Sequence, residues 1–282
     1  MVDRAQRQER ALVVALLASL LLWNLPFGGL VLYPFKLLAT WLHEMSHGIL
    51  MLLTGAGFSH LEIYRDTSGI AFAQRGVGGI GRAAIASAGY MGAALLGASL
   101  LVLGQSGRRA RAILFGFAIA LVLSLIFWVR NDFGMSAVAV AALICAAMAR
   151  FGGESPALLL VNFVAAQACV NAVLDIRVLF RPTLVINGQV VRVSDAHNMA
   201  AASFGSHWVW AGVWLGFSFA CFFVALRVTH LHQRRRARAA ADAAARAEAA
   251  APTPDPPPDG PAPTTAGPPG GSGCSGRDRS PA

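Results

Sequence analysis

Charged side chains are scarce in this sequence. Only 13% of its 282 residues are Asp, Glu, Lys or Arg, whereas 56% are hydrophobic. Soluble domains carry about 25% charged residues, so the composition argues against one and favours a polytopic membrane protein. The charges that exist lie mainly at the ends, with three arginines in residues 1–10 and six in residues 227–246.

Two further absences argue against particular classes of function. No basic patch is interleaved with stacking aromatic residues, which argues against nucleic-acid binding despite the net charge of +9. The basic ends are expected either to face anionic lipid beside membrane spans or to be simply solvated. No CxxC motif occurs, so neither a disulfide framework nor a cysteine zinc site is indicated.

Long apolar stretches define the expected fold. A hydrocarbon core about 30 Å thick needs roughly 20 apolar residues per helix. The sequence therefore predicts an all-α polytopic membrane protein with six to seven transmembrane helices, at about 11–33, 36–55, 79–104, 111–129, 133–149, 157–180 and 206–227. Residues 58–74 and 181–198 alternate around the turn signals DTSG and NG, which predicts short β-hairpin inserts.

Three regions follow from this pattern. Residues 1–10 form a basic N-terminal flank, residues 11–231 form the transmembrane domain, and residues 232–282 form a basic and then Pro/Gly-rich tail. Ten of the fourteen prolines lie beyond residue 247. Such a segment buries too little apolar surface to offset its ordering entropy, so we expect it to be disordered. The Ala- and Arg-rich stretch 232–250 is expected to extend the last helix.

One predicted span carries polar residues at its centre. His43-Glu44-Met45-Ser46-His47 is an H-E-x-x-H motif. Residues four apart share a helix face, so both imidazoles can bind one metal ion, with Glu44 beside them to accept a proton from the water that the metal activates. Thr40 lies on the same face. Zn²⁺ is the expected metal, and the alternative is a hydrogen-bonded cluster or a transporter's proton path.

Catalytic zinc usually takes three protein ligands, so a third must come from elsewhere in the chain. Within the predicted spans, Glu44 and Asp175 are the only acidic residues. Asp175 is therefore the leading candidate. Asp195 and His197, which could fold back over the site, rank below it.

The helix that contains Asp175 has a polar stripe. Gln167, Asn171 and Asp175 are spaced by four on an otherwise apolar helix. Asn171 could hold the carboxylate or bind a substrate carbonyl. The stripe could instead make only interhelical hydrogen bonds, and Asp175 could pair with Arg177 or Arg181.

Small residues recur between the two polar helices. Gly89, Ala93 and Gly97 fall at intervals of four within residues 79–104, a spacing that lets another helix approach closely. This pattern fits generic tight packing, or the close approach of a neighbour that carries the site.

These motifs together resemble the site-2 protease family of intramembrane zinc metalloproteases, in its bacterial Peptidase M50B-like branch. The resemblance covers roughly residues 10–230 and rests on HEMSH at 43–47, ASAGYMGAALLG at 86–97, RNDFG at 130–134, NAVLD at 171–175 and SDAHNMA at 194–200. It implies a metalloprotease-like domain over residues 11–231, with His43, His47 and Asp175 as zinc ligands and Glu44 as the catalytic base.

The expected function is then an intramembrane zinc endopeptidase. It would hydrolyse a peptide bond in or near a membrane-spanning segment of a membrane-protein substrate, within the lipid bilayer of a bacterial plasma membrane. The hairpin at 58–74 could offer the substrate an edge strand, or it could be a plain connection. A non-proteolytic membrane transporter or a pseudo-protease scaffold that uses the same polar cluster is the alternative.

Overall fold

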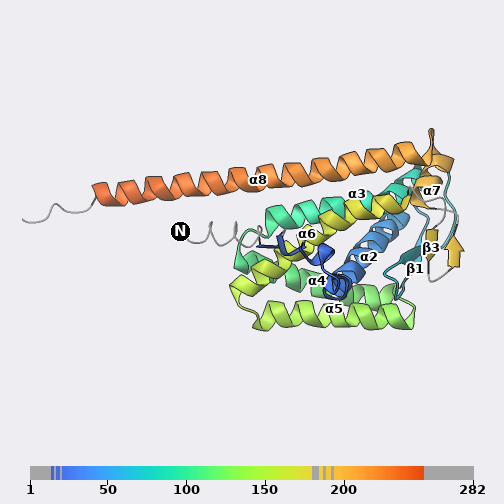
Figure 1. Ribbon diagram of the computed structural model, residues 1–282, viewed down its shortest axis with the longest axis horizontal. Coiled ribbons are helices and arrows are strands. Elements are labelled where there is room, and N and C mark those ends of the chain that lie inside the picture. Colours follow the sequence, from blue (N-terminus) through green and yellow to red (C-terminus); the bar gives the residue numbers. More distant parts are fainter. Residues whose placement is uncertain are drawn as a thin grey trace, which may run out of the picture. The chain divides into compact units, whose positions relative to one another are not determined.

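The computed structural model describes residues 14–15, 17–19, 21–179, 184–186, 189–191 and 194–250, without the side chains of 169, 171–179, 184–186, 189–191, 236 and 248. The chain is mainly helical, as predicted (Figure 1). Its labelled elements are α2 (Gly28–Leu53), β1 (Phe58–Ile63), β2 (Gly69–Ala73), α3 (Gly79–Leu103), α4 (Gly107–Phe127), α5 (Asp132–Phe151), α6 (Glu154–Leu179), β3 (Leu184–Ile186), β4 (Gln189–Val191), α7 (Asp195–Ala202) and α8 (His207–Ala249).

Among the described residues, four helices are long and apolar enough to cross a membrane, namely α3, α4, α5 and α8. A fifth span is obtained if residues 17–24 and α2 are counted as one bent element. The predicted count of six to seven spans is therefore not confirmed. The prediction that the chain is a membrane protein is supported by these spans.

The boundary between the first two predicted spans was misplaced. The apolar pattern predicts a boundary near residue 34, but α2 continues through Pro34, and the break lies at residues 25–27, where the chain bends by 119°. Pro26 lies in this break. A proline inside a helix removes one backbone hydrogen bond, and membrane helices tolerate that loss, so Pro34 does not end α2.

The helices pack around α2, which crosses between the α4–α5 pair and α3 in Figure 1. The Trp41 indole donates a hydrogen bond to Ser124 Oγ at 2.9 Å, which joins α2 to α4 inside the core. The long helix α8 runs beside α3 (Figure 1), where Thr229 Oγ1 donates to the Leu101 carbonyl at 3.4 Å. Most buried apolar side chains lie between α2, α4, α5, α6 and β1.

The predicted hairpin at 58–74 is present as β1 and β2, paired antiparallel with Leu61 opposite Ala71. The second edge of β1 is also occupied. The Leu61 N–H donates to the Trp128 carbonyl at 2.9 Å, and the Arg130 N–H donates to the Leu61 carbonyl at 3.2 Å. The connection between α4 and α5 therefore acts as a third strand, so β2 is the outer strand of this sheet.

The region after α6 differs from its prediction in part. β3 and β4 pair antiparallel, with Ile186 opposite Gln189, in agreement with a hairpin whose turn residues 187–188 lie outside the described part. The predicted hairpin extended to residue 198, but residues 195–202 form helix α7. Ser194 begins this helix by accepting a hydrogen bond on its Oγ from the His197 N–H, which is an ordinary helix cap.

The predicted extension of the last helix is confirmed within the described residues. Helix α8 continues to Ala249, so the Ala- and Arg-rich stretch does extend the last helix. Contacts divide the chain into a unit of residues Met1–Asp242 and a unit of residues Ala243–Ala282. The predicted basic flank at 1–10 and the Pro/Gly-rich residues 251–282 lie outside the described residues.

Candidate metal centre

The two imidazoles of the H-E-x-x-H motif converge as its spacing predicts. His43 and His47 lie one turn apart on α2, and their Nε2 atoms are 3.1 Å from each other. The His47 Nδ1 lies 2.7 Å from the Ile85 carbonyl oxygen of α3. A carbonyl only accepts, so Nδ1 carries a proton, and Nε2 is the ring nitrogen that can bind a metal ion once it is deprotonated.

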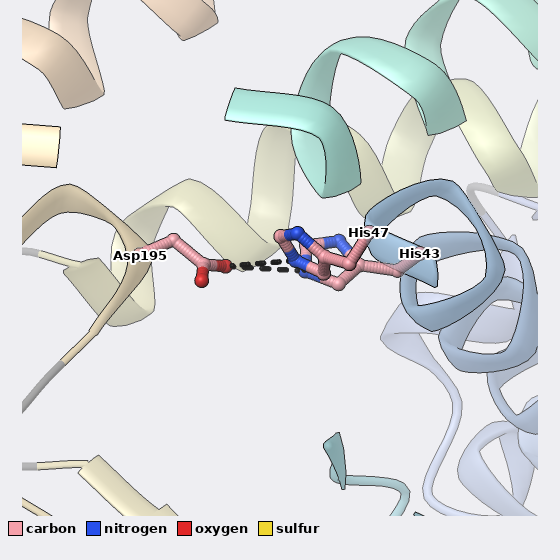
Figure 2. A group of neighbouring side chains, drawn as sticks. All are labelled: His43, His47 and Asp195. Carbon is pink, nitrogen blue, oxygen red and sulfur yellow. Dashed lines mark hydrogen bonds and ion pairs between the residues drawn. The ribbon is translucent and has the colours of Figure 1, made fainter. Parts of the chain in front are cut away.

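A carboxylate from far along the chain completes the group. Asp195, the first residue of α7, places its Oδ2 3.3 Å from His43 Nε2 and 3.3 Å from His47 Nε2 (Figure 2). Burial alone would raise the pKa of Asp195, but the neighbouring His47 and His43 outweigh that effect and hold the pKa well below its usual range. Asp195 is therefore ionised, as a metal ligand must be.

The spacing of these three atoms fits a zinc ion. A tetrahedral site with bonds of about 2.0–2.1 Å places its ligand atoms roughly 3.3–3.4 Å apart. The three separations here are 3.1, 3.3 and 3.3 Å. Two imidazoles and one carboxylate, with a fourth position left open, are also the donor set of catalytic zinc sites. Among the described residues, His43, His47 and Asp195 form a group whose ligand atoms lie close enough together to hold one metal ion.

Helix α7 is held in place by α3 and α8. Ala196 and Met199 of α7 pack in one buried cluster with Tyr90 of α3 and Trp214 of α8. The Tyr90 ring stacks on Trp214 at a centroid distance of 5.1 Å and meets the His43 ring edge-on at 4.8 Å. The same aromatic side chains thus support a metal-site imidazole and the helix that carries Asp195.

Gly89 of α3 lies directly against both imidazoles. A Cβ atom added at Gly89 would overlap Nε2 of His43 and Nε2 of His47. The small-residue spacing noted in the sequence therefore has a specific role at this position, because it lets the α3 backbone approach the metal centre. Generic tight packing alone does not account for Gly89.

Glu44 lies beside the three ligand atoms and under the hairpin. Its side chain is buried, and it interacts electrostatically with His43, His47 and Asp195. The backbone N–H of Ala71 on β2 also interacts with Glu44. An added Cβ at Gly69 would lie 2.9 Å from Glu44 Cγ, so the absent side chain at Gly69 gives Glu44 its room.

Thr40, on the same face of α2 as the H-E-x-x-H motif, contacts two carbonyl groups. Its Oγ1 lies 2.6 Å from the Thr67 carbonyl and 3.0 Å from the Lys36 carbonyl. These contacts tie α2 to the connection between β1 and β2. Thr40 therefore positions the hairpin over Glu44.

The other residues that the sequence predicted for the site lie on α6 and near the start of α7. The backbone of Asn171 and Asp175 belongs to α6, but both side chains lie outside the described residues, so neither role is tested. Gln167, of the same stripe, donates to Ser19 Oγ at 2.9 Å, an interhelical hydrogen bond. His197 Nδ1 lies 2.8 Å from Ser194 Oγ, and among the described side chains it is Asp195 that meets the imidazoles.

Comparison with known proteins identifies the family of this chain. The profile of the Peptidase M50B-like family matches residues 12–225. The chain belongs to this family, as the resemblance to the site-2 proteases predicted. Searches of curated proteins and of solved structures found no match. Family membership, the candidate spans and the His/Asp group together define a membrane protein of the metalloprotease class.

Proposed function

We propose that this protein is a zinc endopeptidase that cleaves membrane-protein substrates in or near a membrane-spanning segment. The observation that carries the proposal is the convergence of His43, His47 and Asp195 Oδ2 within 3.3 Å of one another, beside the buried Glu44. Family membership favours this function over a transporter or an inactive scaffold. The bacterial plasma membrane is the proposed location.

The zinc ligands in this proposal are His43, His47 and a carboxylate. Asp195 is the carboxylate beside the imidazoles, whereas the family resemblance implied Asp175. When bound, zinc would polarise the scissile carbonyl and lower the pKa of a coordinated water toward about 7. Both imidazoles present Nε2, and the Ile85 carbonyl fixes the orientation of His47.

Glu44 is the proposed general base. Its carboxylate interacts electrostatically with all three ligand residues but is not one of the three groups that converge. It would accept the proton of the attacking water and then donate it to the leaving amine, so no net proton is consumed by the side chain. Its burial between α2 and β2 keeps the carboxylate away from bulk water.

The substrate would bind along β2. Leu61 directs its N–H and carbonyl away from β2, toward residues 128 and 130. In antiparallel pairing Ala71, opposite Leu61, must likewise direct its backbone groups to the free side. That side faces Glu44, as the Ala71 N–H shows. An extended substrate added to this edge would therefore pass its backbone beside the proposed base.

The test compares Glu44→Gln with wild type for zinc content and for cleavage of a fluorophore-labelled single-span peptide in the same liposomes. We expect near-stoichiometric zinc in both and a loss of about 10²–10⁴-fold in cleavage rate for the variant. Equal cleavage rates would exclude Glu44 as the base. Glu44-dependent flux of Zn²⁺ or protons into the liposomes, without cleavage by wild type, would support a transporter.

A further inference from the structure

A cavity of about 330 Å³ lies on the opposite side of α2 from α3, between α2 and α5. Its size falls within the range of small-molecule sites. The wall is almost entirely apolar and includes Leu37, Leu38, Trp41, Ala137, Ala141 and Ile144. None of these residues belongs to the metal centre.

The cavity opens toward the region that lipid tails occupy. Helix α5 is one of the candidate membrane spans. Val140 and Ile144 line the cavity and are 57% and 48% exposed, and Leu143 on the same helix is 70% exposed. In a membrane protein such surfaces face lipid, so an apolar occupant can enter from the bilayer without crossing water.

A cation lies beside two residues of the cavity wall. The exposed Arg65, in the connection between β1 and β2, accepts a hydrogen bond on its carbonyl from the Tyr33 hydroxyl at 2.8 Å. Its guanidinium carbon lies 5.6 Å from the centre of the Phe133 ring. Tyr33 and Phe133 both line the cavity. Across the described part of the chain, no carboxylate forms an ion pair with Arg65.

The arrangement has the polarity of a lipid. Phe133, beside Arg65, is the second residue of α5, whereas Ile144 lies eleven residues further on, about 16 Å at 1.5 Å per residue. The charge is thus at the end of the span, where headgroups lie, and the apolar wall runs toward the middle of the bilayer. A transmembrane peptide could fill the apolar part of the cavity, but unlike an anionic lipid it does not necessarily carry a negative charge that could pair with Arg65.

We infer that this cavity binds one acyl chain of an anionic phospholipid, whose phosphate interacts with Arg65. Burial of a chain against apolar side chains supplies the affinity, and the guanidinium supplies the preference for a negatively charged headgroup. This site is independent of the metal centre and of the proposed proteolysis.

Native mass spectrometry of the full-length protein tests the inference, with added phosphatidylglycerol or phosphatidylcholine after removal of bulk lipid. We expect wild type to retain one phosphatidylglycerol per chain in preference to phosphatidylcholine. Ala141→Trp fills the cavity and should reduce retention at least tenfold. Arg65→Gln should remove the preference between the two lipids but leave binding of the chain.

Leu143→Trp is the matched control, because it adds the same side chain to the same helix outside the cavity, and it should bind as wild type does. If Ala141→Trp does not fold, Ala137→Leu takes its place. Unchanged retention in the cavity-filling variant, or an unchanged preference in Arg65→Gln, would overturn the inference. Zinc content should stay at the wild-type level in all variants, so the result does not depend on the metal centre.

Discussion

The backbone of Gly89 packs against the imidazole of His43, so that a methyl group at position 89 would overlap the ring atoms Cε1 and Nε2. Helix α3 therefore forms one wall of the metal centre. Its Ile85 carbonyl, one turn earlier, accepts the hydrogen bond of His47. Two backbone positions on a single helix thus set the place of both imidazoles.

This relationship predicts that Gly89→Ala displaces the imidazoles. The added Cβ must push His43 and His47 off their shared position or move α3 away, and zinc affinity should fall about 10–100-fold, as for other changes that support metal ligands indirectly. Zinc titration against a competing chelator measures the effect. Gly116→Ala on α4, where an added Cβ meets nothing within 4 Å, is the control and should bind zinc like wild type.

The identity of the third ligand gives a second prediction. Asp195→Asn keeps the shape of the side chain but removes the charge that holds zinc between the two histidines. We expect the purified variant to lose most of its zinc, as measured by metal analysis. Asp175→Asn should retain zinc if Asp195 is the ligand. Loss of zinc in Asp175→Asn with retention in Asp195→Asn would transfer the role to Asp175, as the family resemblance implied.

The position of Asp195 beside the imidazoles shows where sequence reasoning reaches its limit. The H-E-x-x-H motif is local, and helix periodicity alone brings His43 and His47 together. Asp195 follows His47 by almost 150 residues, and its position depends on the packing of α7 against α3 and α8. Counting acidic residues inside predicted spans favoured Asp175, because Asp195 lies outside every span.

A local signal for α7 was nevertheless present. Ser194 followed by an acidic residue is typical of a helix start, and the structure shows that Ser194 caps α7. The first hairpin was predicted correctly because alternation and turn residues are also local signals. The boundary between the first two spans was not, since the sequence holds both Pro26 and Pro34 and a membrane helix can continue through a proline.

A third prediction concerns the anchor of the hairpin. Asn131 accepts a hydrogen bond from the Ile63 N–H at 3.1 Å and donates one to the Ile63 carbonyl at 2.6 Å, so it acts as part of a strand beside β1. Asn131→Ala leaves both backbone groups without this partner. The free energy of unfolding should fall by about 1–3 kcal/mol, observed as a lower midpoint in thermal unfolding.

Ser59→Ala is the control for this experiment. Ser59 is exposed on the same strand, and its hydroxyl interacts with the adjacent His60. A change at an exposed position of this kind is usually within about 0.5 kcal/mol. A stability of Asn131→Ala equal to that of Ser59→Ala would show that the α4–α5 connection does not secure the hairpin.

The last prediction separates substrate pairing from hairpin stability. Ala71→Pro removes the N–H that faces Glu44 and, because this group points away from β1, it should leave pairing with β1 intact. Cleavage of the single-span peptide should fall at least tenfold with little change in the unfolding midpoint. Ala71→Ser retains the N–H and should cleave normally.

Ile70→Pro is the contrasting variant. The N–H of residue 70 points toward Glu62 on β1, so its loss should lower the unfolding midpoint as well as the cleavage rate. If Ala71→Pro cleaves at the wild-type rate, the substrate does not pair with β2, and the hairpin serves only to cover Glu44.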